Sequence, residues 1–506
     1  MRKLEFGKTA CIVAVFCIAA AVALSAQTFT TLVEFKGTPH PANPRQLVQG
    51  IDGNFYGVTS GGGKNGGEIE HFSVGGTFFR ITPAGKLTLL YSFCSLANCA
   101  DGSAPNGLIQ TAGGEFYGTA GEGGTSDFAL CGNIGIGCGT FFEIRPGQPP
   151  TALHDFCSEA NCADGFGPWG APLALGPNGN FYGTTADGGN LNGDNNCEWG
   201  CGTIFEITPT GTFTTLHVFC STASCPEGSG GDGLTLFTDG NFYGATLDSL
   251  SGDPGGGLYK INPGGQLTVL YTFDEEGNGD CCATAPIQAT DGNFYGAAEG
   301  GKYGYGFIYK LTPQGTLSSL YNFCALPNCA DGVSPNQLIQ GSDGNFYGTT
   351  TTGGITNPDC SAVGCGTLFQ ITPAGKLTTL HNFCSAAKCA DGFAPQAGLI
   401  QATNGIFYGP TFGGTSGSGT IFSLSMGVNP FVEANPNFGS AGQSVVILGN
   451  NLSGTTGVSF NGTPAAFKVE SDSYIKAKVP TGATSGTIEV TTLGGVLSSN
   501  VAFQVH

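Results

Sequence analysis

The stretch Asp343-Gly344-Asn345-Phe346-Tyr347-Gly348 occurs seven times in the chain, either unchanged or in near variants. The tyrosines of the seven copies are Tyr56, Tyr117, Tyr182, Tyr243, Tyr295, Tyr347 and Tyr408. Successive copies are 52 to 65 residues apart. This spacing is too long for most helical or leucine-rich repeats, and it suits a propeller blade of four strands with one enlarged loop. The repeat therefore predicts an all-β protein built as a β-propeller.

Each copy of the repeat contains four short segments rich in β-branched and aromatic residues, which favours strands. In the fullest copy these segments are residues 336–340, 345–350, 366–372 and 377–383. Tight connections, Asp343-Gly344 and Pro373-Ala374-Gly375, follow the first and third segments. Longer connections follow the second and fourth segments. In a propeller the two kinds of connection emerge on opposite faces, so we expect a tight-turn face and a long-loop face.

The first and last segments of the repeat predict how the propeller closes. The seventh copy ends after its third segment, residues 419–424, with no fourth segment behind it. A spare fourth segment stands near the N-terminus, where residues 29–35 match residues 377–383. We expect this N-terminal strand to complete the last of seven blades and to close the propeller over residues 27–426. Closure would remove the exposed strand edges that promote aggregation.

The repeated phrases also carry a family resemblance. D-G-N-F-Y-G-T-T, G-T-x-F-x-I-T-P-x-G and L-T-T-L-Y-x-F resemble the GloVer-type choice-of-anchor tandem repeat of exported bacterial proteins. That repeat is similar in its strand pattern to NHL propellers. The resemblance covers residues 28–425 and implies a secreted or surface protein of no established activity.

Residues 427–506 carry no copy of the repeat. Apolar and polar residues alternate there between turn signals, at the spacing of a β-sandwich, for example in residues 442–452 and 486–491. The segment resembles an IPT/TIG immunoglobulin-like domain over nearly its whole length. The resemblance implies a spacer or a protein-binding module without catalysis.

The N-terminus has the pattern of a secretory signal peptide over residues 1–26. Basic residues among the first eight precede an apolar stretch, residues 10–24, which ends in Ser25 and Ala26. The apolar stretch is short for a membrane-spanning helix. We therefore expect a mature chain that is secreted, periplasmic or on the cell surface, with no membrane span, and we expect it to be a monomer.

The chain is acidic, with 17 basic and 36 acidic residues and a formal charge of -19. Because phosphate binding rests on clustered Lys and Arg, this composition argues against nucleic acid as a partner. The acidity either keeps an exported protein soluble or provides carboxylates for a divalent cation. The candidate Ca²⁺ ligands are Asp274, Glu275, Glu276 and Asp280. No other cofactor is expected.

Sixteen cysteines fall into eight close pairs. The pairs are Cys94 with Cys99, Cys131 with Cys138, Cys157 with Cys162, Cys197 with Cys201, Cys220 with Cys225, Cys324 with Cys329, Cys360 with Cys365, and Cys384 with Cys389. In an exported chain such pairs predict local disulfides that pin the long loops. Zinc is the alternative, but it needs four converging ligands and the pairs lie in different repeats. For the adjacent Cys281 and Cys282, a vicinal bond and long-range pairing are both open.

Three sets of polar residues recur with the repeat, and each has a structural interpretation. The first set replaces tyrosine at one strand position and consists of His154, His217 and His381. The second set lies in the phrase Cys-Ala-Asp-Gly and consists of Asp101, Asp164, Asp331 and Asp391. Each of these aspartates is expected to cap its own turn, with Ca²⁺ binding or acid–base chemistry on a glycan as the alternative. The third set is Gln49, Gln110, Gln288, Gln340 and Gln401, which either edge a central channel or stabilise a turn.

The candidate ligand site is the one feature that the other repeats do not share. The only tryptophans, Trp169 and Trp199, belong to the third copy and should both reach its long-loop face. Glu198 and Asp194 lie near Trp199 in the sequence. Exposed tryptophans beside carboxylates form a platform for a sugar ring. The alternative is that the two indoles only pack the loops together.

These features predict a non-enzymatic binding protein that recognises glycan or cell-envelope ligands through the disulfide-pinned long-loop face. A secreted carbohydrate-active hydrolase or lyase that uses loop carboxylates is one alternative, and a purely structural surface protein is another. No catalytic residue is assigned, because no histidine stands with a nucleophile in a recognisable elbow.

Overall fold

The computed structural model describes residues 27–69, 72–126, 131, 136–169, 173–189, 197, 199–221, 225, 227–247, 256–273, 282–360 and 362–506. The predicted signal peptide, residues 1–26, lies outside the described residues. In the described part of the chain, no helix is long and apolar enough to span a membrane. Strands dominate the structure, and the few helical segments are short 3₁₀ turns.

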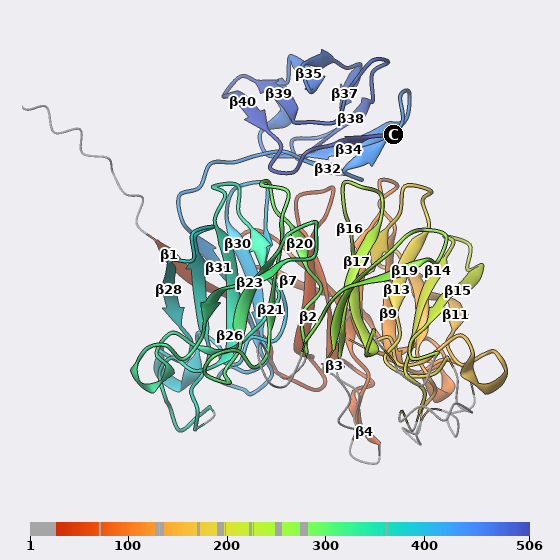
Figure 1. Ribbon diagram of the computed structural model, residues 1–506, viewed down its shortest axis with the longest axis vertical. Helices are drawn as coiled ribbons and strands as arrows, with labels where there is room; N and C mark the ends of the chain where they lie inside the picture. Colours follow the sequence, from red (N-terminus) through yellow and green to blue (C-terminus); the bar gives the residue numbers. More distant parts are fainter. Residues whose placement is uncertain are drawn as a thin grey trace, which may run out of the picture.

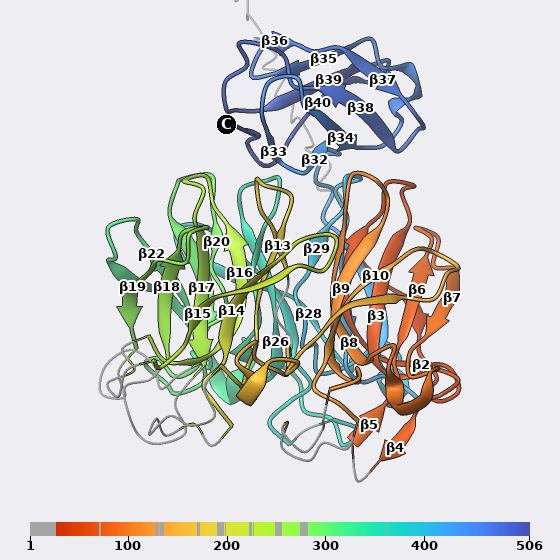
Figure 2. The same ribbon diagram turned by 90° about the vertical axis from the view of Figure 1, so that its right-hand side faces the viewer.

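Residues 28–425 form seven antiparallel sheets, numbered here 1 to 7 in chain order, which stand around a common axis like the blades of a propeller (Figure 1, Figure 2). Sheet 1 comprises β2 (Pro41–Gln49), β3 (Phe55–Gly62), β6 (Thr77–Ile81) and β7 (Leu87–Ser92), and sheet 2 comprises β8 (Ser103–Gln110), β9 (Phe116–Glu122), β10 (Thr140–Ile144) and β11 (Thr151–Asp155). Sheet 3 comprises β12 (Ala174–Leu175), β13 (Phe181–Thr184), β14 (Thr203–Ile207) and β15 (Phe213–Val218). Sheet 4 comprises β16 (Ser229–Leu236), β17 (Phe242–Leu247), β18 (Gly257–Ile261) and β19 (Leu267–Thr272).

Sheets 5 to 7 follow the same plan. Sheet 5 comprises β20 (Ile287–Gln288), β21 (Phe294–Ala298), β22 (Phe307–Leu311) and β23 (Leu317–Asn322). Sheet 6 comprises β24 (Val333–Pro335), β25 (Ile339–Gln340), β26 (Phe346–Thr352), β27 (Thr367–Ile371) and β28 (Leu377–Asn382). Sheet 7 comprises β29 (Ile400–Gln401), β30 (Phe407–Thr411), β31 (Thr420–Ser425) and β1 (Thr28–Glu34). The N-terminal β1 pairs with β31 of the last repeat, as predicted from the missing fourth segment of that repeat. The short hairpin of β4 (Gly67–Ile69) and β5 (Phe72–Val74) extends from sheet 1.

The glycine that ends the repeated phrase makes room for an aromatic ring of the same sheet. In sheet 6, a Cβ atom added at Gly348 would lie 2.7 Å from Cζ of Phe369 and 2.8 Å from Cδ2 of Leu338. The same relation holds in the other six sheets, between Gly57 and Phe79, Gly118 and Phe142, Gly183 and Phe205, Gly244 and Tyr259, Gly296 and Tyr309, and Gly409 and Phe422. Glycine therefore recurs because a ring fills the space of its side chain in a close-packed core.

The Phe-Tyr pair of the repeat joins neighbouring sheets. The tyrosine of each sheet packs against the phenylalanine of the next, as Tyr347 of sheet 6 does with Phe407 of sheet 7 at a centroid distance of 4.1 Å. The other pairs, all between 4.1 and 4.8 Å, are Tyr56 with Phe116, Tyr117 with Phe181, Tyr182 with Phe242, Tyr243 with Phe294, Tyr295 with Phe346, and Tyr408 with Phe55. The last pair joins sheet 7 to sheet 1.

The rest of the phrase builds the tight turn. In sheet 6, Asp343 accepts hydrogen bonds from the backbone N–H of Asn345 at 3.1 Å and from the hydroxyl of Tyr347 at 2.8 Å. Gly344 has φ +81°, a conformation that favours glycine. One phrase therefore specifies the turn, the core and the contact with the next sheet.

The recurrent glutamines tie five of the seven tight turns to the next sheet. Gln110 of sheet 2 accepts a hydrogen bond from the backbone N–H of Ile51 in the turn of sheet 1, at 2.9 Å. Gln288, Gln340, Gln401 and Gln49 accept the corresponding N–H groups of Thr238, Thr290, Ser342 and Thr403 at 2.8 to 3.0 Å. The turn-stabilising interpretation is thus confirmed, and the contact crosses between sheets. The other two junctions have no such glutamine. Leu175 holds the acceptor position between sheets 2 and 3, and Leu236 holds it between sheets 3 and 4, where the donor position is Pro177, which has no N–H.

The C-terminal domain is an immunoglobulin-like sandwich that stands on the tight-turn face (Figure 1). Its strands are β32 (Glu433–Asn435), β33 (Phe438–Gly439), β34 (Ser444–Leu448), β35 (Gly457–Phe460), β36 (Thr463–Pro464), β37 (Phe467–Val469), β38 (Tyr474–Lys478), β39 (Ile488–Thr492), β40 (Gly495–Ser498) and β41 (Gln504–Val505). Its own core includes Ile447, Ile475 and Phe503.

Hydrogen bonds hold this domain over sheets 7, 1 and 2. Asn450 donates to Oγ1 of Thr403 at 2.7 Å, and the Ser473 hydroxyl donates to the carbonyl of Ile51 at 2.7 Å. Asn435 donates to the carbonyl of Gln110 at 2.9 Å. The tight-turn face is therefore partly covered, whereas the long loops lie on the opposite face (Figure 2).

The variant Gly348→Ala should destabilise the protein by about 1–3 kcal/mol, because the added methyl group overpacks the core against Phe369. Equilibrium denaturation in urea would measure the loss. Gly67→Ala is the matched control, since a Cβ atom there meets nothing within 4 Å. Equal stability of the two variants would contradict the packing role of the repeated glycine.

The variant Gln49→Leu, which copies the leucine found at position 236, should lower the free energy of unfolding by about 1–2 kcal/mol. The substitution leaves the backbone N–H of Thr403 without the acceptor that joins sheet 7 to sheet 1. Chemical denaturation would measure it, with Gln504→Leu as a surface control on the C-terminal domain. An unchanged unfolding midpoint would show that this contact does not stabilise the fold.

Candidate functional site

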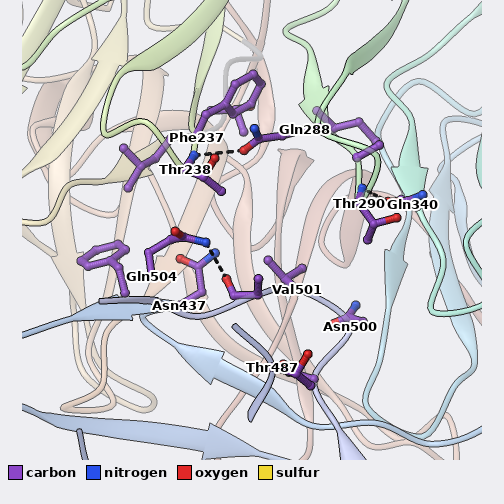
Figure 3. A pocket seen from close by; sticks show the side chains of 18 of the residues that line it. Phe237, Thr238, Gln288, Thr290, Gln340, Asn437, Thr487, Asn500, Val501 and Gln504 are labelled. Carbon is purple, nitrogen blue, oxygen red and sulfur yellow. Dashed lines mark hydrogen bonds between the residues drawn. The ribbon is translucent and has the colours of Figure 1, made fainter. Parts of the chain in front are cut away.

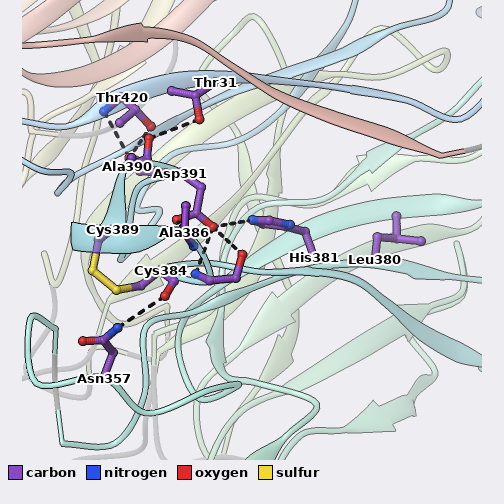
Figure 4. Close-up of polar contacts among 12 residues, drawn as sticks. Thr31, Asn357, Leu380, His381, Cys384, Ala386, Cys389, Ala390, Asp391 and Thr420 are labelled. Atoms are coloured by element: carbon purple, nitrogen blue, oxygen red, sulfur yellow. Dashed lines mark hydrogen bonds and ion pairs between the residues drawn. A yellow bond between two sulfur atoms is a disulfide. The ribbon is translucent and has the colours of Figure 1, made fainter.

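The aspartates of the Cys-Ala-Asp-Gly phrases cap their own turns on the long-loop face. Asp391 accepts the backbone N–H groups of Ser385 and Ala386 at 3.0 and 3.1 Å, the Ser385 hydroxyl at 2.7 Å, and Nε2 of His381 at 2.9 Å (Figure 4). The Cys384–Cys389 disulfide closes the same turn. Burial alone would raise the pKa of Asp391, but the hydrogen bonds from His381, Ser385 and Ala386 outweigh it and hold the pKa below its ordinary value.

The same arrangement occurs after four other sheets. Each time, the side chain ten residues before the carboxylate reaches it, in the pairs Tyr91 with Asp101, His154 with Asp164, His217 with Glu227, and Tyr321 with Asp331. Histidine and tyrosine are thus interchangeable as hydrogen-bond partners in one structural position. The imidazoles of His154 and His381 also stack on Phe213 and Phe29 at 4.1 and 3.7 Å. The structural interpretations of these histidines and aspartates are confirmed.

All eight predicted disulfides are present. Three groups of close cysteines, each a disulfide beside a sulfur of a second disulfide, have the geometry of a metal site: Cys131, Cys138 and Cys157; Cys197, Cys201 and Cys220; and Cys360, Cys365 and Cys384. Their sulfurs are oxidised, so these groups supply no thiolate for zinc. Cys282 is also disulfide-bonded, whereas Cys281 lies outside the described residues.

The predicted ligand platform is only partly within the described residues. Trp169 and Trp199 are each 39% exposed. The Trp169 indole packs closely on its own loop, since a Cβ atom added at Gly167 would lie 2.8 Å from Cδ1 of Trp169. A Cβ atom at Gly121 of sheet 2 would lie 3.0 Å from Cδ2, so the indole packs between sheet 2 and its own loop, which leads into sheet 3.

The other predicted site residues are not placed by the structure. Glu198 and Asp194, the carboxylates near Trp199, lie outside the described residues. So do the four candidate Ca²⁺ ligands, Asp274, Glu275, Glu276 and Asp280. Both proposals for these residues remain sequence-based expectations.

A polar hollow of about 280 Å³ lies at the axis of the seven sheets, where the innermost strands meet. Its lining includes Arg45, Gln46, Asn106, Asp232, Thr284, Asn336, Gln337 and Gln396. Most of these residues are amides, and Arg45 and Asp232 are the two charged groups of the lining. The hollow joins side chains from sheets 1, 2, 4 and 6 with Thr284 and Gln396, which precede sheets 5 and 7.

Sequence reasoning missed this hollow, although a signal for it exists. A proline that packs on the glycine before the third strand of the preceding sheet recurs in five repeats, and the residue after it is Arg45, Asn106, Trp169, Asn336 or Gln396. Asn106 donates to the carbonyl of Pro168 at 2.6 Å, and Asn336 donates to that of Pro395 at 2.8 Å. Trp169 therefore follows a proline, Pro168, whose carbonyl is hydrogen-bonded to Asn106 in the wall of the polar hollow.

Burial shifts the pKa of each charged group of the hollow, and each group has one hydrogen-bond partner in the protein. Arg45 donates from Nε to the Ser60 hydroxyl at 3.2 Å, and burial lowers its pKa. Burial raises the pKa of Asp232 to about 6, although a hydrogen bond from the backbone of Ala285 opposes the shift. The Asp232 carboxylate is thus partly satisfied by the protein.

The C-terminal domain covers the other end of the axis. There the lining turns apolar, with Leu47, Ile109 and Leu338, and is completed by Asn435 and Pro436 of the domain. The polar hollow lies on the long-loop side of this apolar lining, because Arg45 precedes Leu47 on β2, which runs from Pro41 at the long-loop face to Gln49 at the tight turn.

A second cleft of about 630 Å³ separates the C-terminal domain from the turns of sheets 4 to 6 (Figure 3). Phe237, Gln288 and Gln340 line it from the sheets, and Asn500 and Val501 line it from the domain. Gln288 and Gln340 are already bonded to neighbouring turns. The cleft is present because the domain is hydrogen-bonded to sheets 7, 1 and 2 and does not cover the turns of sheets 4 to 6.

The family model of the Gloeobacter/Verrucomicrobia repeat matches residues 18–235 and 230–465, and the IPT/TIG domain model matches residues 431–505. The chain belongs to the Gloeobacter/Verrucomicrobia repeat family and ends in an IPT/TIG domain. No curated protein matches it.

Among solved structures it is similar to PorZ, a bacterial surface component of the type-IX secretion system of Porphyromonas gingivalis, with 13% identity, a TM-score of 0.46, and coverage of 94% of this chain and 60% of PorZ. It is also similar to a protein of unknown function from Bacteroides thetaiotaomicron, with 13% identity, a TM-score of 0.37, and coverage of 79% and 96%.

The variant Asp391→Asn should lose about 1.5–3 kcal/mol of stability at neutral pH, because the charged acceptor of His381, Ser385 and Ala386 is removed. The folded-state pKa of Asp391 lies below its unfolded value, so this stabilisation is fully present above about pH 4 and is lost as the pH falls through the folded-state pKa. Urea denaturation at several pH values would measure it. Asp359→Asn, an exposed loop aspartate, is the control; a pH-independent difference from the wild type would contradict this account.

Proposed function

We propose that this is an exported, non-enzymatic binding protein in which a closed seven-bladed propeller presents a glycan or cell-envelope ligand site on its long-loop face. The carrying observation is the placement of Trp169: it is exposed, it packs on sheet 2 in the loop that leads into sheet 3, and that loop is hydrogen-bonded through Pro168 to Asn106 in the wall of the polar hollow. An indole on a loop that is hydrogen-bonded to the wall of an amide-lined hollow combines an apolar face with nearby hydrogen-bonding groups, which suits a sugar.

Two contacts between the first and last repeats support closure of the propeller. Tyr408 packs against Phe55 at 4.2 Å, and Gln49 accepts the N–H of Thr403 at 2.9 Å. Both contacts have the same form as those between successive sheets, so sheet 7 meets sheet 1 as any neighbour would. A closed ring gives the long loops a rigid base.

Export is supported by the eight disulfides, which are typical of extracellular and cell-surface proteins. A binding role without chemistry is supported by the turn carboxylates of the long-loop face. Asp101, Asp164, Asp331 and Asp391 accept several hydrogen bonds each, and their oxygens are thus engaged in holding turns.

A carbohydrate-active hydrolase is the second candidate, and one observation favours it. Glu122 and Asp187 each lie five residues after the tyrosine of their repeat, in the second and third repeats, and the loop of Trp169 lies between them in the chain. Burial raises the pKa of Glu122 to about 7 and that of Asp187 to about 6. A carboxyl group with a pKa raised toward neutrality, as in Glu122, is suited to act as a general acid on a glycosidic bond.

The test is a binding screen of oxidised residues 27–506 against immobilised neutral and acidic glycans. Trp169→Ala should weaken binding by at least about fivefold, because stacking of a sugar on the indole is lost. Leu493→Ala is the matched control, since Leu493 is 88% exposed on the C-terminal domain. Trp199→Ala tests the second indole.

Each outcome of the screen separates the candidates. Binding that Trp169→Ala and Trp199→Ala leave unchanged would exclude this face as the site. Mass spectrometry of the recovered glycans would reveal cleavage, and cleavage abolished by Glu122→Gln would identify a hydrolase. An absence of binding across the screen would favour a purely structural surface protein.

A further inference from the structure

Arg45 is a cation without an acidic partner inside the polar hollow. The chain has more than two acidic residues for each basic one, and other basic side chains such as Arg145, Lys310 and Lys468 form ion pairs. Arg45 instead makes a single hydrogen bond, from Nε to Ser60. Within the described part of the chain, its terminal nitrogens make no hydrogen bond and no ion pair.

An unpaired charge in a partly buried site is costly, and an anion that enters the site offsets this cost. The guanidinium presents its free donors as a planar fork, which matches the two oxygens of a carboxylate. The unsatisfied side of Arg45 therefore selects for a carboxylate over a neutral group.

The surrounding amides supply the rest of the recognition. Asn106 and Asn336 are occupied in joining neighbouring sheets. In contrast, Gln337 and Gln396 make no side-chain hydrogen bond in the described structure, and Gln46 uses only its oxygen, on the N–H of Leu108. Free amides both donate and accept, so they suit the hydroxyl groups of a sugar.

The size of the hollow limits the ligand. Its volume of about 280 Å³ is just below the range of about 300–1,000 Å³ typical of pockets for drug-sized molecules. One sugar residue is of suitable size, and the remainder of a chain would extend toward Trp169 at the long-loop face.

We infer that the polar hollow binds the carboxylate-bearing terminal residue of an acidic glycan, with the carboxylate on Arg45 and the hydroxyls on Gln46, Gln337 and Gln396. This inference rests on the proposed glycan-binding function and names the ligand class of that site.

Asp232 makes the binding depend on pH. It shares the lining with Arg45, and around it stand Thr284, the Ala285 N–H, and the buried tyrosines Tyr259 and Tyr309. Burial raises the pKa of both tyrosines, and Arg45 stays charged, so Asp232 is the one among these groups of the hollow that changes charge between about pH 5 and pH 8. Its ionised form repels an anion, and affinity should therefore rise as the pH falls below the pKa of Asp232.

The experiment titrates oxidised residues 27–506 with glucuronate and galacturonate by calorimetry, and with glucose and galactose as matched neutral ligands. Uronates should bind at least about tenfold more tightly than the neutral sugars, and more tightly at about pH 5 than at about pH 7.5. Arg45→Gln should lose at least about tenfold in uronate affinity, and Arg45→Lys should recover part of it. Asp232→Asn should remove the pH dependence.

Arg145→Gln is the control, since Arg145 is exposed and ion-paired on sheet 2. Equal binding of uronates and neutral sugars, or an unchanged affinity in Arg45→Gln with its unfolding midpoint preserved, would overturn the inference. Glycan binding that needs Trp169 but not Arg45 would leave the proposed function standing without this ligand class. Uronate binding that needs Arg45 but not Trp169, with no binding of longer glycans, would leave the carboxylate site of the hollow standing and contradict the proposed function. Equal binding of free acetate would assign the site to carboxylates in general.

Discussion

The contact on which the whole structure depends is that between the tyrosine of one sheet and the phenylalanine of the next. A four-stranded sheet of this size cannot bury both of its faces alone, so each sheet needs a neighbour on either side. The repeated Phe-Tyr pair meets both needs, because the two side chains pack toward opposite neighbours. The series from Tyr56–Phe116 to Tyr408–Phe55 keeps centroid distances between 4.1 and 4.8 Å.

The polar residues of the repeat serve this packing rather than chemistry. Asp343 orders a turn, Gln340 carries a turn of sheet 5 onto sheet 6, and Asp391 holds a loop closed by Cys384–Cys389. A group that repeats from sheet to sheet is therefore evidence of a structural task. We propose that Arg45, Asp232 and Trp169, which stand at positions where the side chain varies between repeats, recognise a ligand.

Much of the fold could be predicted because its signals are local in the sequence. The strands, the disulfide pairs and the capped turns each depend on residues within about ten positions of one another, so their spacing reveals them. The spare strand at residues 29–35 was also recognisable, since it copies residues 377–383. The candidate site is less evident in the sequence. Trp169 is a candidate because tryptophan is rare in this chain, whereas Arg45 belongs to a strand segment whose pattern indicates only a structural role.

The sequence by itself determined the repeat, its four strands, its disulfides and the IPT/TIG tail, because short-range hydrogen bonds and covalent links require particular neighbours in the chain. Only the tertiary structure placed Arg45 and Asp232 in one hollow, and set the C-terminal domain over sheets 7, 1 and 2. The physical reason is that these groups come from repeats far apart in the chain. Their approach depends on how the sheets are arranged around a common axis, which no local pattern encodes.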